Sequence, residues 1–409
     1  MKNRWLLSAL SAATICVEAA ATLAGCATDA GTGDGPSEDR TTPVPAPVTD
    51  GGLEAADAGD APVCVEDCEF YPDECTEDAL CMAPLFGPDP SIALDLRTGV
   101  FALVGRSPND GWIAGAAGTV ARFDGTSWKR SETGIQNSLY GLWLLDGAEV
   151  AFDDPTRLYT RGLDAGADAG ASADGWSPFA AVTVPASQWR NMRIETTWAH
   201  PGSRTLFVGA RASSPTGSAG GGLWRLRYSP ADNVFALDSV TLNKCGTTIP
   251  CGEVYGLHGL SADEVWAVGP RGAAFRVTDA ESATPTLTAQ NTLTLYALHG
   301  VWAAASNDVW AVGSTGTVRR YRGDPRFWEV YEDLPTQQHL YAIAGSSPSD
   351  IWVAGDEGTV FHYDGTAWKR VKVAGLAGRR PRLDRIWMPS PGKVWIAGQG
   401  ALVSLGGKP

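Results

Sequence analysis

The sequence lacks the short motifs that mark several common kinds of enzyme active site. It contains no G-x-S-x-G nucleophile elbow, no H-E-x-x-H zinc motif and no P-loop. Its five histidines stand outside any such motif. No sequence signal therefore points to catalysis, and we expect neither a cofactor nor a resident metal.

The sequence also lacks an excess of positive charge. Residues 27–85 carry 15 acidic residues against one basic residue, Arg40, whereas residues 86–409 carry 30 acidic and 29 basic residues. Nonspecific nucleic-acid binding needs a concentrated basic surface. The main part of the chain is nearly neutral, so we do not expect nucleic acid as a partner.

A hydrophobic run long enough to span a bilayer is absent, because the apolar run from Trp5 to Val17 falls short of the ~20 residues required. Lys2 and Arg4 precede the run, and L-A-G-C follows at 23–26. This pattern resembles the bacterial lipobox, which implies a signal peptide over 1–25 and a lipid anchor on Cys26. The resemblance implies that the exported chain is anchored to a lipid bilayer, at the outer membrane or cell surface. An uncleaved anchor over residues 5–25 is the alternative.

Residues 26–62 are rich in Asp, Gly, Ala, Thr and Pro and contain almost nothing that can form a core. Such a composition predicts a disordered acidic linker. As a flexible coil it would reach roughly 30 Å, enough to clear the lipid headgroups.

Six cysteines remain once Cys16 and Cys26 are assigned to the signal peptide and the lipobox. An even number in an exported chain predicts disulfides. We expect two disulfides within the segment 63–86 and one that closes a short loop. The cysteines concerned are Cys64, Cys68, Cys75 and Cys81 in that segment, and Cys245 and Cys251 in the loop. A four-cysteine zinc site is the alternative, although the paired C-x2-C spacing is missing. The acidic residues of the same segment lack the regular ligand spacing of a calcium loop.

A repeat dominates the rest of the chain. D-V-W-A-V-G at 308–313 is followed by G-T-V at 316–318, and related copies occur at 110–120 and 350–360. Trp266, Trp310, Trp352 and Trp395 hold the same place in successive copies, at spacings of 44, 42 and 43 residues. Each copy predicts four short strands, here termed a to d. Strand b is apolar at consecutive positions, so both of its faces are buried. Such units stack radially into an all-β propeller.

The count of copies predicts one propeller over residues 87–409, with seven four-stranded blades. The strand a segments are expected near Val100, Leu139, Arg193, Val254, Leu295, Leu340 and Leu383. The last blade ends after three strands. Residues 91–96 are predicted to supply the missing strand, which closes the ring from the N-terminal side and removes its exposed edges. We expect a monomer.

The repeat resembles the Trp-rich propeller repeats of surface lipoproteins and secreted proteins of Gram-negative bacteria. It is more distantly similar to the Asp-box repeats of sialidases, through D-G-T-S-W at 124–128 and D-G-T-A-W at 364–368. These resemblances imply a propeller. They leave two functions open. One is a non-catalytic binding or scaffold module at the cell surface. The other is a glycan-active hydrolase or lyase, which would need acidic residues converging at one end of the channel.

Two repeated residue types were candidates for chemistry. His258 and His299 both lie in L-H-G sequences, which predicts equivalent positions and suggests either a metal pair in the channel or a repeated packing position. Asp110, Asp308 and Asp350 precede strand b, where aspartate commonly caps a turn, and that role is favoured over catalysis.

The loops predict which face binds a ligand. In a propeller the d–a and b–c connections share one face, and the unique insertions at 212–221, 244–253 and 375–383 belong mostly to that face. Variation collects where a partner is recognised. The last of these loops contains Arg379, Arg380 and Arg382, and Arg385 follows shortly after it. They are candidates to bind carboxylate or phosphate groups, on a surface polysaccharide or a protein. The alternative is an exposed basic loop that only aids solubility.

Overall fold

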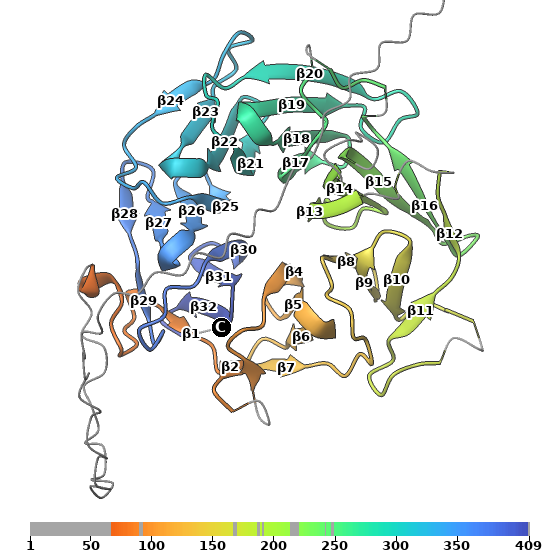
Figure 1. Cartoon of the computed structure of the whole chain (residues 1–409), viewed down its shortest axis with the longest axis horizontal. Coiled ribbons are helices and arrows are strands. Elements are labelled where there is room, and N and C mark those ends of the chain that lie inside the picture. The colour runs from red at the N-terminus through yellow and green to blue at the C-terminus, as the bar shows by residue number, and fades with distance from the viewer. Residues whose placement is uncertain are drawn as a thin grey trace, which may run out of the picture. The chain divides into compact units, whose positions relative to one another are not determined.

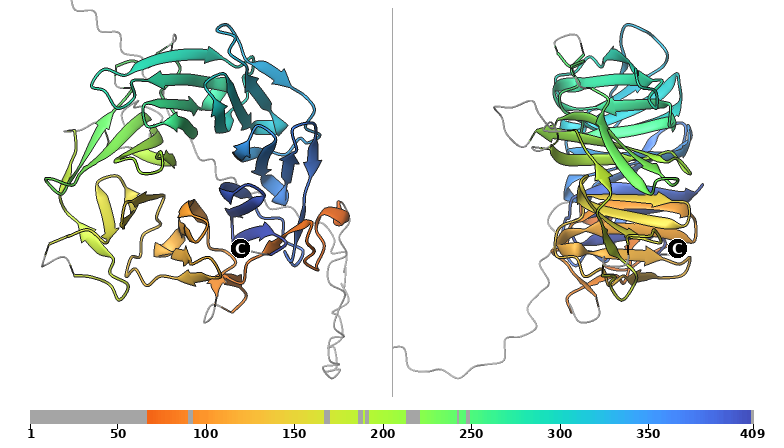
Figure 2. Two further views of the ribbon diagram at one scale, coloured as in Figure 1. Left: turned by 180° about the vertical axis from the view of Figure 1, so that it is seen from behind. Right: turned by 90° about the vertical axis from the view of Figure 1, so that its right-hand side faces the viewer.

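The chain forms a seven-bladed β-propeller around a central channel (Figure 1). The structure is a computed structural model. It describes residues 67–89, 93–166, 170–185, 189, 192–212, 221–241, 243–246 and 249–407. The two views in Figure 2 show the seven sheets side by side around the ring. The predicted fold class and blade number are confirmed. Cys26, Cys64 and the predicted linker lie outside the described residues.

In each of the first four blades, the four main strands follow one another in chain order from the innermost strand to the outermost. Blade 1 contains β4 (Val100–Ser107), β5 (Asp110–Gly115), β6 (Val120–Phe123) and β7 (Trp128–Arg130). Blade 2 contains β8 (Gly141–Leu145), β9 (Ala148–Asp154), β10 (Arg157–Arg161) and β11 (Ser177–Phe179). Blade 3 contains β13 (Met192–Trp198), β14 (Thr205–Ala212), β15 (Gly222–Ser229) and β16 (Val234–Ser239), with β12 (Val182–Thr183) parallel to β16 at its outer edge. Blade 4 contains β17 (Gly256–Ser261), β18 (Glu264–Val268), β19 (Ala273–Thr278) and β20 (Thr286–Asn291).

The remaining blades repeat this order. Blade 5 contains β21 (Leu298–Ala305), β22 (Asp308–Gly313), β23 (Val318–Tyr321) and β24 (Glu329–Tyr331). Blade 6 contains β25 (Leu340–Ser347), β26 (Asp350–Gly355), β27 (Val360–Tyr363) and β28 (Trp368–Arg370). Blade 7 contains β30 (Leu383–Ser390), β31 (Lys393–Gly398), β32 (Ala401–Leu405), β1 (Ala79–Met82) and β29 (Lys372–Ala374). A small separate sheet pairs β2 (Phe86–Gly87) with β3 (Leu94–Asp95), and a 3-10 turn, η1, spans Cys68–Phe70.

The turns between strands b and c explain the glycine of the G-T-V motif. Ala117 and Gly118 both have positive φ, 51° and 68°, as a type I′ hairpin turn requires. The same geometry recurs in the short turns η3 (Pro270–Gly272), η4 (Ser314–Gly316) and η5 (Asp356–Gly358). The turn consists of two residues, and the motif glycine is the second of them.

The ring closes through a different strand from the one predicted. β1 pairs antiparallel with β32 and parallel with β29, so residues 79–82 fill the empty strand d position of blade 7. The prediction of residues 91–96 was wrong, because Leu94 and Asp95 pair instead with Phe86 and Gly87. The physical reason is burial: Ala79 and Leu80 are completely buried in the closing sheet. Closure from the N-terminal side is confirmed.

A clasp formed by residues 67–82 holds β1 in place. Tyr71 donates a hydrogen bond from its hydroxyl to the carbonyl of Glu357, and Arg370 forms an ion pair with Asp67. A disulfide joins Cys245 to Cys251, as predicted. Another joins Cys75 to Cys81, within the segment where two disulfides were predicted and their pairing was left open. Cys68 is also disulfide-bonded. Because these sulfurs are consumed in disulfides, the four-cysteine zinc site is wrong.

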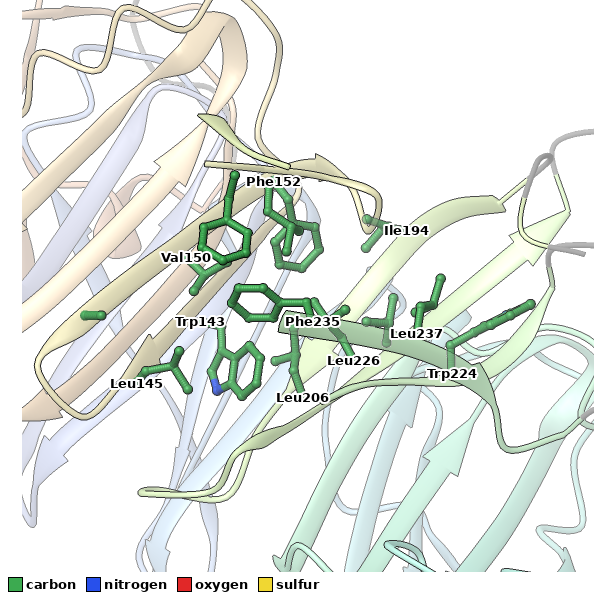
Figure 3. Close-up of a cluster of buried hydrophobic side chains, with 14 of the residues drawn as sticks. Trp143, Leu145, Val150, Phe152, Ile194, Leu206, Trp224, Leu226, Phe235 and Leu237 are labelled. Atoms are coloured by element: carbon green, nitrogen blue, oxygen red, sulfur yellow. The ribbon is translucent and has the colours of Figure 1, made fainter. Parts of the chain in front are cut away.

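Large and small residues alternate between neighbouring strands a. Trp198, Trp302 and Trp387 each lie over a glycine of the next blade, Gly259, Gly345 and Gly105 respectively. A Cβ atom on Gly345 would lie 2.6 Å from the Trp302 ring, so these positions admit no larger side chain without movement. Between blades 2 and 3 the core is filled by Trp143, Phe152 and Phe235 with surrounding aliphatic side chains (Figure 3).

Among the described residues, no helix has the length and apolar character needed to cross a bilayer.

Candidate functional site

The central channel is the main cavity of the propeller. It has a volume of about 980 Å³ and is lined by the innermost strands of six blades. Its wall is chemically uneven. The end where strands a finish contains Trp198, Trp302 and Trp387, which are used in packing between blades. The end where strands a begin carries charged and aromatic side chains, and we call it the mouth.

One residue from each blade defines the mouth. In each blade, one residue of strand a pairs with the central aromatic residue of strand b, or with the residue that takes its place. The residue three positions earlier in strand a occupies the same place in every blade. We call this set the mouth ring. It consists of Phe101, Tyr140, Glu195, Tyr255, His299, Tyr341 and Asp384.

A repeated irregularity of the backbone presents the mouth ring. In blades 1, 3, 5, 6 and 7 the pairing register of strand a shifts across the ring residue, as between Leu340 and Ala342 on either side of Tyr341. A bulge of this kind re-aims a side chain away from the regular pleat. All five bulged residues line the channel. The bulges therefore turn polar and aromatic side chains towards the channel, at positions that the hydrophobic pattern of a regular strand does not reveal.

Aromatic side chains contact one another along the mouth ring. Phe101 stacks on Tyr140 with ring centroids 4.9 Å apart. His299 lies 5.7 Å from Tyr255 on one side and 4.9 Å from Tyr341 on the other. Tyr140 is 41% exposed. The mouth ring thus exposes preformed aromatic faces, and burial of such faces by a ligand contributes strongly to binding free energy.

Two carboxylates of the mouth ring are each held by two arginines. Glu195 lies 2.6 Å from the guanidinium of Arg211 and 3.5 Å from that of Arg193. Burial nevertheless raises the pKa of Glu195, and the two arginines only partly oppose it.

The second carboxylate, Asp384, lies 3.0 Å from Arg382 and 3.5 Å from Arg385. In both clusters the arginines are more exposed than the carboxylate they surround: Arg193 is 62% exposed against 24% for Glu195, and Arg382 is 40% exposed against 8% for Asp384. At both positions the arginines are therefore the charged groups more accessible to solvent.

A third acidic residue, Glu253, contacts the mouth ring by a hydrogen bond to a tyrosine. The Tyr255 hydroxyl donates a hydrogen bond of 2.7 Å to Glu253, and burial together with this carboxylate raises the pKa of Tyr255 to about 12. Each acidic side chain of the mouth described here therefore has a partner. That arrangement fits a recognition surface, in which polar groups are fixed in advance.

The four predicted arginines do not form one basic patch. Arg379 donates a hydrogen bond to the carbonyl of Gly400, and Arg380 stacks over Tyr71 of the clasp with its guanidinium carbon 3.6 Å from the ring centroid. Arg382 and Arg385 instead line the channel. The loop at 375–383 is thus divided between holding the clasp and forming the mouth. Of the other predicted insertions, residues 213–220 lie outside the described residues.

His258 and His299 are not equivalent, so this prediction was wrong. His258 pairs opposite Trp266, whereas His299 lies three positions earlier in the strand, at the bulge. The cause is that β21 begins at Leu298 and not near Leu295. His258 accepts a hydrogen bond from the backbone N–H of Ala303, a packing role, and burial lowers the pKa of both histidines to about 4. Within the described residues no three His, Cys, Asp or Glu side chains converge as a metal site.

The repeated aspartates before strand b tie strands together. Asp110 and Asp350 each accept a hydrogen bond of 3.0 Å from the indole N–H two residues later. Asp308 instead accepts from Arg320 in the neighbouring strand. They act across strands more than as turn caps, and they lie near the face opposite the mouth.

Comparison with known proteins supports the fold and no more. No family model and no curated protein matches the chain. A solved structure described as YCF48 bound to D1 peptide has a TM-score of 0.53 and 14% identity, and the match covers 81% of this chain and 96% of that one. YCF48 from Cyanidioschyzon merolae gives a TM-score of 0.54 at 14% identity, covering 75% and 95%. The WD40 propeller domain of Doa1 gives 0.51 at 9%, covering 80% and 96%. None of these names a Trp-rich lipoprotein.

Sequence reasoning missed most of the mouth ring, including Glu195, Tyr255 and Tyr341. A signal was present: V-F-A-L at 100–103, V-Y-G-L at 254–257 and L-Y-A-I at 340–343 each carry an aromatic residue directly after the first apolar residue of strand a. An aromatic side chain in a buried strand suggests core packing. The structure shows that these side chains line the channel instead, Phe101 and Tyr341 at bulges and Tyr255 directly before β17.

Proposed function

We propose that this protein is a non-catalytic recognition module that binds its ligand at the mouth of the channel. The observation that carries the proposal is the mouth ring, in which seven blades contribute one residue each to a surface of stacked aromatic rings and arginine-held carboxylates. A site of this kind combines apolar contact area with fixed polar groups, as small binding sites usually do.

The solved structure described as YCF48 bound to D1 peptide supports this proposal by analogy. It shows that a propeller of similar fold is a peptide-binding protein, at an identity too low to transfer the ligand.

The proposal includes a membrane anchor. The lipobox-like L-A-G-C at 23–26 supports acylation of Cys26, and the acidic linker after it would hold the propeller away from the lipid surface. A tethered binding module gains effective concentration for ligands at the same surface.

The proposal is tested by binding of the full chain to a glycan array and to an array of random-sequence peptides. We expect one class of ligand to be retained, and the double variant Tyr255→Ala/Tyr341→Ala to bind it at least ~10-fold more weakly, because two aromatic contact surfaces are lost. Phe327→Ala is the matched control, since Phe327 is also an exposed aromatic residue (42%) but lies in a c–d loop on the opposite face. Equal binding by the double variant would refute the proposal, and so would cleavage of a retained glycan by the wild type.

A further inference from the structure

The loop that joins β20 to β21 displays apolar side chains beside the mouth. Leu293, Leu295 and Tyr296 are 49%, 86% and 55% exposed. Single exposed apolar residues are ordinary, but three within four residues form a patch. The loop is a d–a connection, so it lies on the same face as the mouth. Its last residue, Ala297, lines the channel.

This loop is held rigidly. The Thr292 side chain is buried and donates a hydrogen bond of 2.7 Å to the carbonyl of Gly272. Arg319 donates to the carbonyls of Thr292 and Leu293, at 2.8 and 3.3 Å. A fixed loop loses little conformational freedom when a partner covers it.

Leu293 is held in an unfavourable conformation. Its φ is 53°, in the left-handed region that costs a bulky non-glycine residue about 1 kcal/mol or more. The backbone N–H of Leu293 is bonded to the Asn291 side chain, which stabilises the turn. The sequence therefore keeps a strained backbone that presents an apolar side chain to solvent. Strain of this kind clusters at binding surfaces.

A continuous path joins the loop to the basic part of the mouth. It runs from Ala297 to His299, across 4.9 Å to the Tyr341 ring, and across a further 4.8 Å to the guanidinium of Arg382. Arg385 lies beyond, on the other side of Asp384. The path begins at the exposed apolar patch and ends at Arg382 and Arg385, which flank Asp384. On the way, the Tyr341 hydroxyl donates a hydrogen bond to Asp356.

We propose that this path binds a short peptide segment of a partner protein that carries apolar side chains together with Asp or Glu. The inference rests on the proposed function and specifies its ligand. Apolar side chains of the peptide would cover Leu293, Leu295 and Tyr296, and its carboxylates would meet Arg382 and Arg385. A polysaccharide fits less well, because the two leucines have no polar atoms with which to pair the hydroxyl groups they would desolvate.

The experiment probes the full chain against an array of random-sequence peptides at low and high salt. The retained peptides should combine Leu, Ile, Phe or Tyr with Asp or Glu. Leu295→Ser should weaken their binding by roughly tenfold and remove the apolar preference, since burial of one such side chain is worth about 1.5 kcal/mol. Arg382→Gln should reduce the acidic preference and the salt dependence, while Arg382→Lys, which keeps the charge, should retain much of both.

Matched controls lie on the opposite face. Phe327→Ser removes another exposed apolar side chain, and Arg326→Gln removes an arginine that is 74% exposed. Both should bind as the wild type does. Retention of peptides without the apolar and acidic preference, or unchanged binding by Leu295→Ser, would overturn the inference. Retention of glycans alone would overturn it while leaving the mouth as the binding site, and retention of neither class would overturn both proposals.

Discussion

Replacement of Leu80 by alanine tests how the propeller closes. Leu80 is fully buried in β1, where it lies opposite Leu405 of β32 and Val373 of β29. Truncation of a fully buried leucine removes its apolar contacts and leaves a cavity, at a cost of about 3 kcal/mol. In a domain of this size each kcal/mol lowers the melting temperature by about 2 °C, so we expect a drop of about 6 °C.

The assay is thermal unfolding of the full, oxidised chain, followed by circular dichroism. Leu295→Ala is the matched control, because Leu295 is 86% exposed and its truncation should change stability by less than about 0.5 kcal/mol. If Leu80→Ala melts with the wild type, β1 does not close the ring, and the closing strand must be sought elsewhere.

Three further predictions follow from packing, burial and the signal sequence. Gly345→Ala should destabilise the fold by about 1–3 kcal/mol, because the new Cβ would lie 2.6 Å from the Trp302 ring, and Trp302→Leu in the same chain should recover part of the loss in a melting assay; no recovery would contradict this contact. Burial holds the pKa of His258 and His299 at about 4, below the unfolded value of 6.5, so protonation favours the unfolded chain. Stability should therefore be full above pH 6.5 and fall as the pH drops from 6.5 towards 4, and denaturant titrations should show a shallower fall for His258→Gln; an equal fall would assign the effect to other groups. Metabolic labelling with palmitate should mark the wild type and spare Cys26→Ala, and equal labelling of the two would remove Cys26 as the anchor.

The repeat made the fold predictable because each blade buries the same apolar strand. Strand b is apolar on both faces in every regular copy, and Trp266, Trp310 and Trp352 mark its position in the sequence. The closing strand was harder to predict, since residues 79–82 and 91–96 both carry short apolar runs. Their difference depends on long-range pairing with β32 and β29, which local sequence does not encode.

The proposed site lies on the face that the sequence predicts, but only some of its residues could be predicted. The d–a connections do border the mouth, and Arg382 and Arg385 do line it. Arg380 was indistinguishable from them in sequence, yet Tyr71, about 300 residues earlier in the chain, draws it to the clasp. The position of His299 was predicted wrongly, because the repeated L-H-G sequence suggested the same place in strand a as His258. The strand pairing of β21 shows that His299 lies three positions earlier, at the bulge.

Hydrogen exchange of the full chain, with and without a ligand retained from the arrays, tests binding at the mouth most directly. Bound ligand should slow exchange in the d–a loops at 292–297 and 375–382, which border the mouth. The a–b turns at 107–110 and 347–350, on the opposite face, should exchange as in the free protein. Protection of those turns, with the d–a loops unchanged, would contradict the account.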